Sequence, residues 1–323
     1  MIGHGTFDIP VVLFIFKRTS CTLKIIERLR EVRVKKIYLI ADAGRTPDEQ
    51  ILVDECRDKV LNAIDWECEV IRNFADVNRG VYNNIGLGAD WVFSQEEEAI
   101  FLEDDNLPEL SFFDYCAEML QKFRNNDEIF WICGTNYLED LDELNQSSYY
   151  LTKSLLPCGW ASWSKKYRKY YDKDFSRYLS SDGKREFRKS YSNRWLRLQQ
   201  KLSIDTEILR RRLGYGYASW DYQVVSTIRC NRLFGIMPSR NQIKNIGVDA
   251  MSIHGGNSME DEMTKRFCGI DSYPLRFPLI HLGEDCLDDN VEKRIDQIIL
   301  QPISYRLKSL VRFFLLLIKG KKK

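Results

Sequence analysis

The sequence predicts an α/β fold with a doubly wound, mostly parallel central sheet flanked by helices. Short, continuous apolar runs recur at 10–16, 35–42 and 99–102, as in strands that are buried on both faces of a sheet. Segments with apolar residues at helical spacing separate these runs. This alternation is typical of a parallel sheet, because each parallel connection must cross over the sheet.

Each predicted element of the N-terminal part has its own local signal. Buried or alternating apolar segments predict strands at 10–16, 35–42, 67–72 and 99–102. Apolar periodicity predicts a helix at 22–33. We also expect a charged helix at 47–63 and another helix at 80–93. Pro47 suits the first turn of the second helix, because its missing N–H would have no partner there anyway.

The C-terminal part predicts further helices and strands of the same unit. A helix at 111–125 begins with Ser111 as a plausible cap. Other expected elements are a strand at 129–136, a basic, tyrosine-rich helix within 155–170, helices within 172–212, helix then strand at 224–236, and a polar loop at 238–257. Because the chain has no internal repeat and no flexible linker, we expect one composite domain.

Composition favours a folded protein in a reducing compartment. The 323 residues are 44% hydrophobic and 29% charged, and the net charge of +1 gives no field that would favour a nucleic-acid partner. Nine Cys without a CxxC pair and only three His disfavour a zinc-type site and indicate free thiols. The first residues lack the charged and apolar regions of a signal peptide, so we expect a cytoplasmic protein.

Three consecutive carboxylates, at 103–105, end the predicted strand at 99–102. Like charges at a strand end repel unless a positive charge lies among them, and Mg²⁺ or Mn²⁺ with substrate phosphates suits carboxylate oxygens. An acidic turn explains these residues alone equally well. Arg18 and Asp42 also follow predicted strands, and ligands of parallel sheets bind at this edge. The combination favours a nucleotide-type site.

The tail at 304–323 is basic and apolar. Its longest uncharged run, 313–318, is far shorter than the roughly 20 apolar residues of a membrane span. Apolar residues interspersed with Arg306, Lys308 and Arg312 suit a helix that lies on an anionic membrane surface. The alternative is a terminal helix packed on the domain with a frayed basic end.

The chain resembles the type A (GT-A) fold of nucleotide-sugar glycosyltransferases, particularly the inverting enzymes related to N-acetylglucosaminyltransferase I and bacterial surface-glycan transferases. The segments that carry the resemblance are FIFKRTS (14–20), LIADAGR (39–45), NRGVYNNIGLGADWVF (78–93), FLEDDNLPELSFFDYC (101–116), LPCGWASWSKKY (156–167) and SWDYQ (219–223). It implies a nucleotide-sugar half at 1–135, a helical acceptor half at 136–300 and the amphipathic tail at 301–323.

The resemblance also implies individual roles. Asp105 would ligate Mn²⁺ or Mg²⁺, Asp104 would approach the ribose or donor sugar, and Glu103 would support the site. Asp42 would contact the base, usually uracil, and Arg18 the base or phosphates. Asp221 stands in the place of the catalytic base, which takes the acceptor proton.

Four further residues have an ordinary structural explanation beside the functional one. Arg79 suits phosphate binding, but Asn-Arg-Gly is also a plain helix-entry turn. Trp160 and Trp220 suit sugar-ring contacts, but they equally suit core packing. His254 lies in the polar loop that closes over the donor in matching enzymes, where it would reach the metal or phosphate; an exposed loop His is the ordinary case.

The predicted function is inverting, metal-dependent transfer of a sugar from a nucleotide-diphosphate donor to a hydroxyl of a glycan or lipid-linked glycan. We expect the donor to be UDP-linked. We expect the transfer at the cytoplasmic face of a bacterial membrane. One alternative is a sugar-nucleotide nucleotidyltransferase, but 17–20 lacks the Gly-rich loop of that class. A non-catalytic glycan-binding protein on the same fold is the other.

Overall fold

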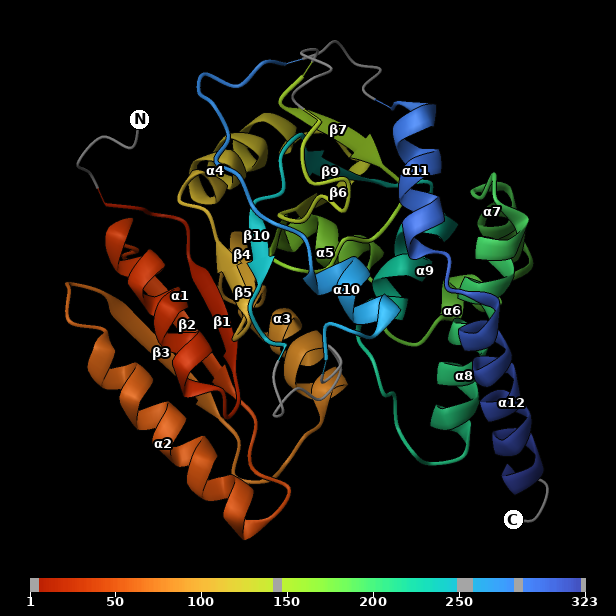
Figure 1. Ribbon diagram of the computed structural model, residues 1–323, viewed down its shortest axis with the longest axis horizontal. Coiled ribbons are helices and arrows are strands. Elements are labelled where there is room, and N and C mark those ends of the chain that lie inside the picture. The colour runs from red at the N-terminus through yellow and green to blue at the C-terminus, as the bar shows by residue number, and fades with distance from the viewer. Residues whose placement is uncertain (1–5, 142–146, 249–257, 282–286, 321–323) are drawn as a thin grey trace.

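The computed structural model describes residues 6–141, 147–248, 258–281 and 287–320. Its centre is an eight-stranded sheet with the order β3-β2-β1-β4-β8-β6-β9-β7, and helices cover both faces (Figure 1). Strands β1 with β2, β1 with β4, β2 with β3 and β6 with β9 are parallel, and the other three pairings are antiparallel. The predicted α/β class with a mostly parallel sheet is therefore confirmed.

The N-terminal elements follow the predicted alternation. They are β1 (Val11–Ile15), α1 (Thr19–Glu31), β2 (Lys36–Ala41), α2 (Pro47–Ala63), β3 (Glu69–Phe74), a π-helical turn (Tyr82–Gly86), α3 (Leu87–Val92) and β4 (Glu98–Glu103). Helix α2 has the predicted bounds, since Pro47 takes the first helical position and the Thr46 hydroxyl accepts from the Glu49 N–H.

The C-terminal elements are more irregular than predicted. They are β5 (Asn106–Pro108), α4 (Ser111–Phe123), β6 (Ile129–Cys133), β7 (Tyr149–Thr152), β8 (Trp160–Trp163), α5 (Ser164–Tyr170), α6 (Ser176–Leu179), α7 (Ser181–Lys189), α8 (Arg194–Arg212), α9 (Asp221–Asn231), β9 (Phe234–Pro238), β10 (Ile243–Asn245), α10 (Glu262–Cys268), α11 (Asp289–Ile299) and α12 (Ile303–Gly320). Strand β8 enters the sheet antiparallel between β4 and β6, in a segment where no strand was predicted.

The core lies on both faces of the sheet, as the continuous apolar runs require. Val11, Leu13 and Ile15 of β1 pack with α1, α2 and α4 on one face. Val12 and Phe14 pack with α3, α5 and α9 on the other. Because successive side chains alternate between faces, a strand buried on both sides must be apolar throughout.

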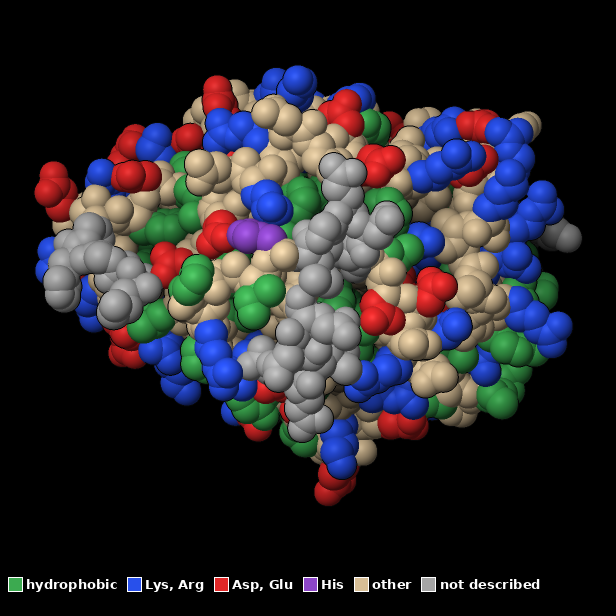
Figure 2. Space-filling view, turned by 90° about the horizontal axis from the view of Figure 1, so that it is seen from above, with side chains coloured by type: hydrophobic (Ala, Val, Ile, Leu, Met, Phe, Trp, Pro, Cys, Tyr) green, Lys and Arg blue, Asp and Glu red, His purple; other side chains and the backbone are tan. Residues whose placement is uncertain are grey.

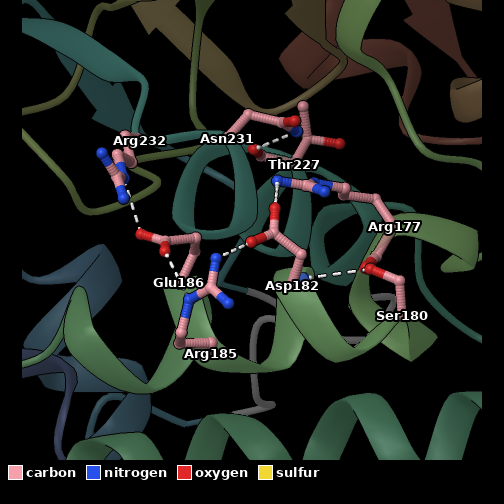
Figure 3. A network of polar contacts seen from close by, with 9 residues as sticks. Arg177, Ser180, Asp182, Arg185, Glu186, Thr227, Asn231 and Arg232 are labelled. Carbon is pink, nitrogen blue, oxygen red and sulfur yellow. Dashed lines mark hydrogen bonds and ion pairs between the residues drawn. The ribbon is translucent and has the colours of Figure 1, made fainter.

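Helices α6 to α9 build a smaller lobe at one end of the sheet, with its own apolar cluster. Charged side chains fasten α7 within it (Figure 3). Asp182 pairs with Arg177 and Arg185, and Glu186 pairs with Arg185 and, at 2.6 Å, with Arg232 at the end of α9. The bond from Arg232, with that from Arg185, lowers the pKa of Glu186 to about 2. The pairs thereby join α7 to α9.

Two broader predictions concern thiols and membrane spans. Among the described residues, Cys56, Cys68, Cys116, Cys133, Cys158 and Cys230 are free thiols, as predicted. No helix in these residues is long and apolar enough to cross a membrane.

Lys166 fastens α5 to the sheet from a buried position. Its ammonium donates to the carbonyls of Phe123, Asn126 and Ile129 at 2.6, 2.7 and 2.8 Å, and lies 3.6 Å from the Trp163 ring centroid. It therefore satisfies carbonyls between the end of α4 and the start of β6, which border the antiparallel strand β8.

We expect Lys166→Met to lower the free energy of unfolding by about 2 kcal/mol or more, because three carbonyls lose a charged donor in a buried place. Lys165→Met, at the exposed neighbouring position, is the matched control and should change stability by less than about 0.5 kcal/mol. Urea unfolding of both variants measures the difference. Equal effects would contradict this role of Lys166.

Candidate active site at the carboxyl edge of the sheet

The candidate site lies where the strand order of the sheet reverses. From β1 the chain moves outward through β2 to β3, and β4 then returns to the other side of β1. The carboxyl ends of β1 and β4 therefore border the crevice in which open parallel sheets bind ligands. Arg18 follows β1, and Glu103 is the last residue of β4.

Arg18 lies among the carboxylates that follow β4. Its Nη2 is 2.5 Å from Asp104 Oδ1 and 3.0 Å from Asp105 Oδ2, and its Nη1 donates to the Gly247 carbonyl at 3.3 Å. Burial alone would lower the pKa of Arg18, but the charges of Asp104 and Asp105 raise it well above its ordinary value. From the sequence we expected a bound metal to supply positive charge among these carboxylates. In the structure, Arg18 supplies positive charge there.

One guanidinium does not balance all the carboxylates. Burial, and then the charges of Asp105 and Asp104, raises the pKa of Glu103. Burial also raises the pKa of Asp104, against the attraction of Arg18. Asp104 is 5% exposed, and its Oδ2 has no hydrogen-bond partner among the described residues. An unpartnered buried carboxylate oxygen is a place for a cation or a donor.

Asp221 lies near the triplet although it is distant in sequence. It is the first residue of α9, and its charge contributes to the raised pKa of Glu103. Burial raises the pKa of Asp221 itself to about 6, and its Oδ1 has no partner within the described chain. Its neighbour Trp220 faces Trp160, which stacks on Phe101 of β4, so Asp221 lies near the end of β4 that carries the triplet.

Asn106 connects the triplet to the loop before β8. Its Oδ1 accepts from the Gly159 N–H at 2.9 Å, and its Nδ2 donates to Asp105 Oδ1 at 2.6 Å. Gly159 has φ +62°, and a Cβ there would lie 2.5 Å from Ile243 Cδ1, so the position requires glycine. Asn106 was not predicted as a site residue; its place directly after the triplet was the available signal.

Gly247 lies directly on the Arg18–Asp105 pair. A Cβ at this position would be 2.2 Å from Arg18 Nη1 and 2.5 Å from Asp105 Oδ2. The Ile246 N–H donates to the Asp105 carbonyl at 2.9 Å. The first part of the predicted polar loop therefore covers the triplet, whereas His254 lies outside the described residues.

Asp42 organises a neighbouring loop. Its Oδ1 accepts from the N–H groups of Ala43 and Arg79, and its Oδ2 accepts from Asn78 Nδ2 and the Gly80 N–H. Four bonds occupy the usual acceptor positions of a carboxylate. The Arg79 guanidinium donates to Asn73 Oδ1 at 2.9 Å. Contact of Asp42 with a base, and of Arg79 with phosphates, stay predictions.

Trp160 and Trp220 are core residues in this structure. Trp160 is 2% exposed and is stacked between Phe101 and Trp131, with centroid separations of 3.8 and 4.0 Å. Trp220 is 6% exposed and faces Trp131 and Trp160. The faces that were predicted to meet a sugar ring are covered, so we leave both residues out of the donor site.

The donor set suits a cation that is shared with a ligand. No cluster of three or more His, Cys, Asp or Glu that could hold a metal occurs among the described residues. Mg²⁺ commonly takes only one or two carboxylates and completes its shell with phosphates and water. Asp105 and the unpartnered Asp104 Oδ2 fit that pattern.

Comparison with known proteins leaves the family open. No protein-family model and no curated protein matches the chain. A mannosyltransferase, PcManGT from Pyrobaculum calidifontis in complex with GDP-Man and Mn²⁺, aligns with 70% of each chain at 8% identity and TM-score 0.38. HddC from Yersinia pseudotuberculosis aligns with 55% of this chain and 85% of its own, at 12% identity and TM-score 0.32.

A third structure, UDP-glucose pyrophosphorylase complexed with UDP-glucose, aligns with 46% of this chain and 64% of its own, at 13% identity and TM-score 0.27. Similarities this weak carry no argument about function.

We expect Arg18→Met to lower the free energy of unfolding at pH 8 by about 3 kcal/mol, because it leaves buried carboxylates without their counter-charge. Without Arg18, the pKa of folded Asp104 rises further above its unfolded value, so the loss is largest at high pH. It should shrink as the pH falls and Asp104 becomes protonated. Urea unfolding at several pH values, from about 4 to about 8, measures both effects.

Arg28→Met is the control for this experiment, because Arg28 forms a surface pair with Glu31 at 3.1 Å. It should change stability by less than about 1 kcal/mol at any pH. A loss in Arg18→Met that does not depend on pH would contradict the electrostatic explanation.

Proposed function

We propose that this protein is an inverting, metal-dependent glycosyltransferase that uses a nucleotide-diphosphate sugar. The observation that carries the proposal is a buried carboxylate with an unpartnered oxygen, Asp221 Oδ1, near an acidic triplet that pairs with Arg18 through Asp104 and Asp105 at the switch point of the sheet. Sugar transfer needs both parts: a base for the acceptor hydroxyl, and charge that holds the departing diphosphate. Transfer from UDP-sugars, and inversion, are proposed from the sequence resemblance.

The triplet side would hold the donor. Asp105, with Asp104, would ligate Mn²⁺ or Mg²⁺, which supplies charge neutralisation for the diphosphate when bound. Arg18 has guanidinium N–H groups beyond those that contact Asp104 and Asp105, and a guanidinium fork suits phosphate oxygens. Glu103 would support the site.

The Asp221 side would receive the acceptor. A pKa of about 6 leaves Asp221 ionised at neutral pH, yet makes it more basic than an ordinary Asp, and its Oδ1 is unoccupied by any described group. As the acceptor oxygen bonds to the anomeric carbon, its proton passes to Asp221 and the bond to the diphosphate oxygen breaks. The nucleoside diphosphate leaves with that electron pair.

The halves of the chain would divide this work. Residues 1–135 would form the donor half, 136–300 the acceptor half, and 301–323 a separate tail. The acceptor would be a hydroxyl of a glycan or lipid-linked glycan at the cytoplasmic face of a bacterial membrane. The membrane part of the proposal rests on α12.

Metal-dependent nucleotide binding tests the donor side. We expect isothermal titration to show UDP binding that is much tighter with Mn²⁺ than with EDTA. Asp105→Asn should remove this metal-dependent gain, because it deletes the charge of the predicted ligand. Asp58→Asn, at an exposed position on α2, is the control and should keep the gain. Equal UDP binding with and without metal in the wild type would contradict the proposal.

Turnover tests the base. We expect Asp221→Asn to keep UDP binding but to lower the rate of UDP release from the donor sugar by about 10²–10⁴-fold. Asp289→Asn alters the corresponding first position of α11 and should leave the rate unchanged. Because the base must be deprotonated, kcat/KM of the wild type should rise with pH and reach half its maximum near pH 6.

Two results would overturn the assignment of the base and the reaction. Near-normal turnover of Asp221→Asn would show that another group takes the proton. Release of pyrophosphate from a nucleoside triphosphate and a sugar phosphate, without sugar transfer, would instead identify a nucleotidyltransferase.

A further inference from the structure

Helix α12 exposes an unusually apolar surface. It spans Ile303–Gly320, and none of its residues is buried. Seven of its large apolar side chains are between 39% and 67% exposed: Ile303, Leu307, Leu310, Val311, Phe314, Leu315 and Ile318. Their spacing of three and four residues places them on one side of the helix, which we call the apolar face.

The helix is attached to the protein by its other side. Arg306 lies 5.6 Å from the Trp195 ring near the start of α8, and a Cβ on Gly320 would be 2.7 Å from Leu213 at its end. Half-buried Tyr305, whose hydroxyl donates to Asp261 Oδ2 at 2.5 Å, belongs to the attached side. Helix α12 therefore runs alongside α8 (Figure 1) and presents its apolar face outward.

The charge of α12 is of one sign. The helix contains no Asp or Glu, and Lys308, Arg312 and Lys319 lie along one flank of the apolar face. Three lysines follow it in the sequence. Basic side chains also gather at the right-hand end of the face shown in Figure 2, the end where the helical lobe lies.

The positive charge beside the apolar face indicates which kind of partner binds it. Two copies of the chain joined through their apolar faces would bring the flanking cations together without any acidic partner on α12, which is unfavourable. An anionic lipid surface supplies the missing opposite charge and takes up the apolar side chains.

We propose that the apolar face of α12 docks on an anionic membrane surface, with the helix axis in the plane of the headgroups. The 18-residue helix is about 27 Å long, so it would lie along the surface as one contact. The attached side keeps the domain next to the membrane. The inference deepens the proposed function by placing the site beside lipid-linked acceptors, but its test needs no turnover.

Vesicle flotation of the purified full chain tests the docking. The protein should float with vesicles that contain phosphatidylglycerol and phosphatidylcholine, much less with phosphatidylcholine alone, and less at high salt. Leu310→Asp with Phe314→Asp should lower binding at least tenfold, because both side chains are exposed on the apolar face. Lys308→Glu with Arg312→Glu should remove the preference for anionic vesicles.

The matched control is Ile51→Asp with Leu52→Asp, which places the same charges on exposed apolar positions of α2. It should bind vesicles like the wild type, and circular dichroism should show that all variants fold. Absence of wild-type binding to anionic vesicles, or equal loss in the control, would overturn the proposal. So would a wild-type dimer in sedimentation that Leu310→Asp with Phe314→Asp converts to monomer, because a second copy would then cover the face.

Discussion

The ion pair of Arg18 with Asp104 and Asp105 is the constraint on which the rest of the site depends. It joins the ends of β1 and β4, the two strands between which the sheet reverses its order. Without it, two aspartates that directly follow β4 would lack a counter-charge in a poorly hydrated place, which would destabilise the fold. Asn106 and Gly247 then fit around the pair, one from the same turn and one from a segment far along the chain.

The same pair leaves the site short of positive charge. Arg18 faces Glu103, Asp104 and Asp105, with Asp221 close by, and burial raises the pKa of three of these carboxyls. A bare diphosphate entering this crevice would meet net negative charge. We therefore expect the affinities for a divalent cation and for a diphosphate to be thermodynamically linked, each ligand strengthening the other. Such linkage follows from the excess of carboxylates over cationic side chains in the site. It does not depend on which sugar the nucleotide donor contains.

Local patterns predicted the parallel half of the fold well, because its strands and helices are determined by short runs of residues. Apolar continuity located β1, β2 and β4, and strand ends that share one edge predicted that Arg18 lies near the triplet. The ion pair between them was not predicted. Strand β8 was missed, because it exists through pairing with β4 and β6, partners that local periodicity does not reveal. Trp160 lies next to a glycine that suggested a ligand surface, yet Phe101 and Trp131 cover both faces of its ring, a contact only the tertiary structure specifies.

The short ribbon of β5 and β10 has a mechanical consequence for the acidic triplet. Strand β5 begins at Asn106, immediately after Asp105, and its residues pair with 243–245. The Ile246 N–H and the tight approach of Gly247 continue that contact onto Asp105 itself. These two pieces of chain therefore contact Asp105 directly, from outside the central sheet, through both its backbone carbonyl and its carboxylate. A ligand or substitution that repositions residues 243–247 would therefore change the surroundings of the proposed metal ligand, even if it lies outside the crevice.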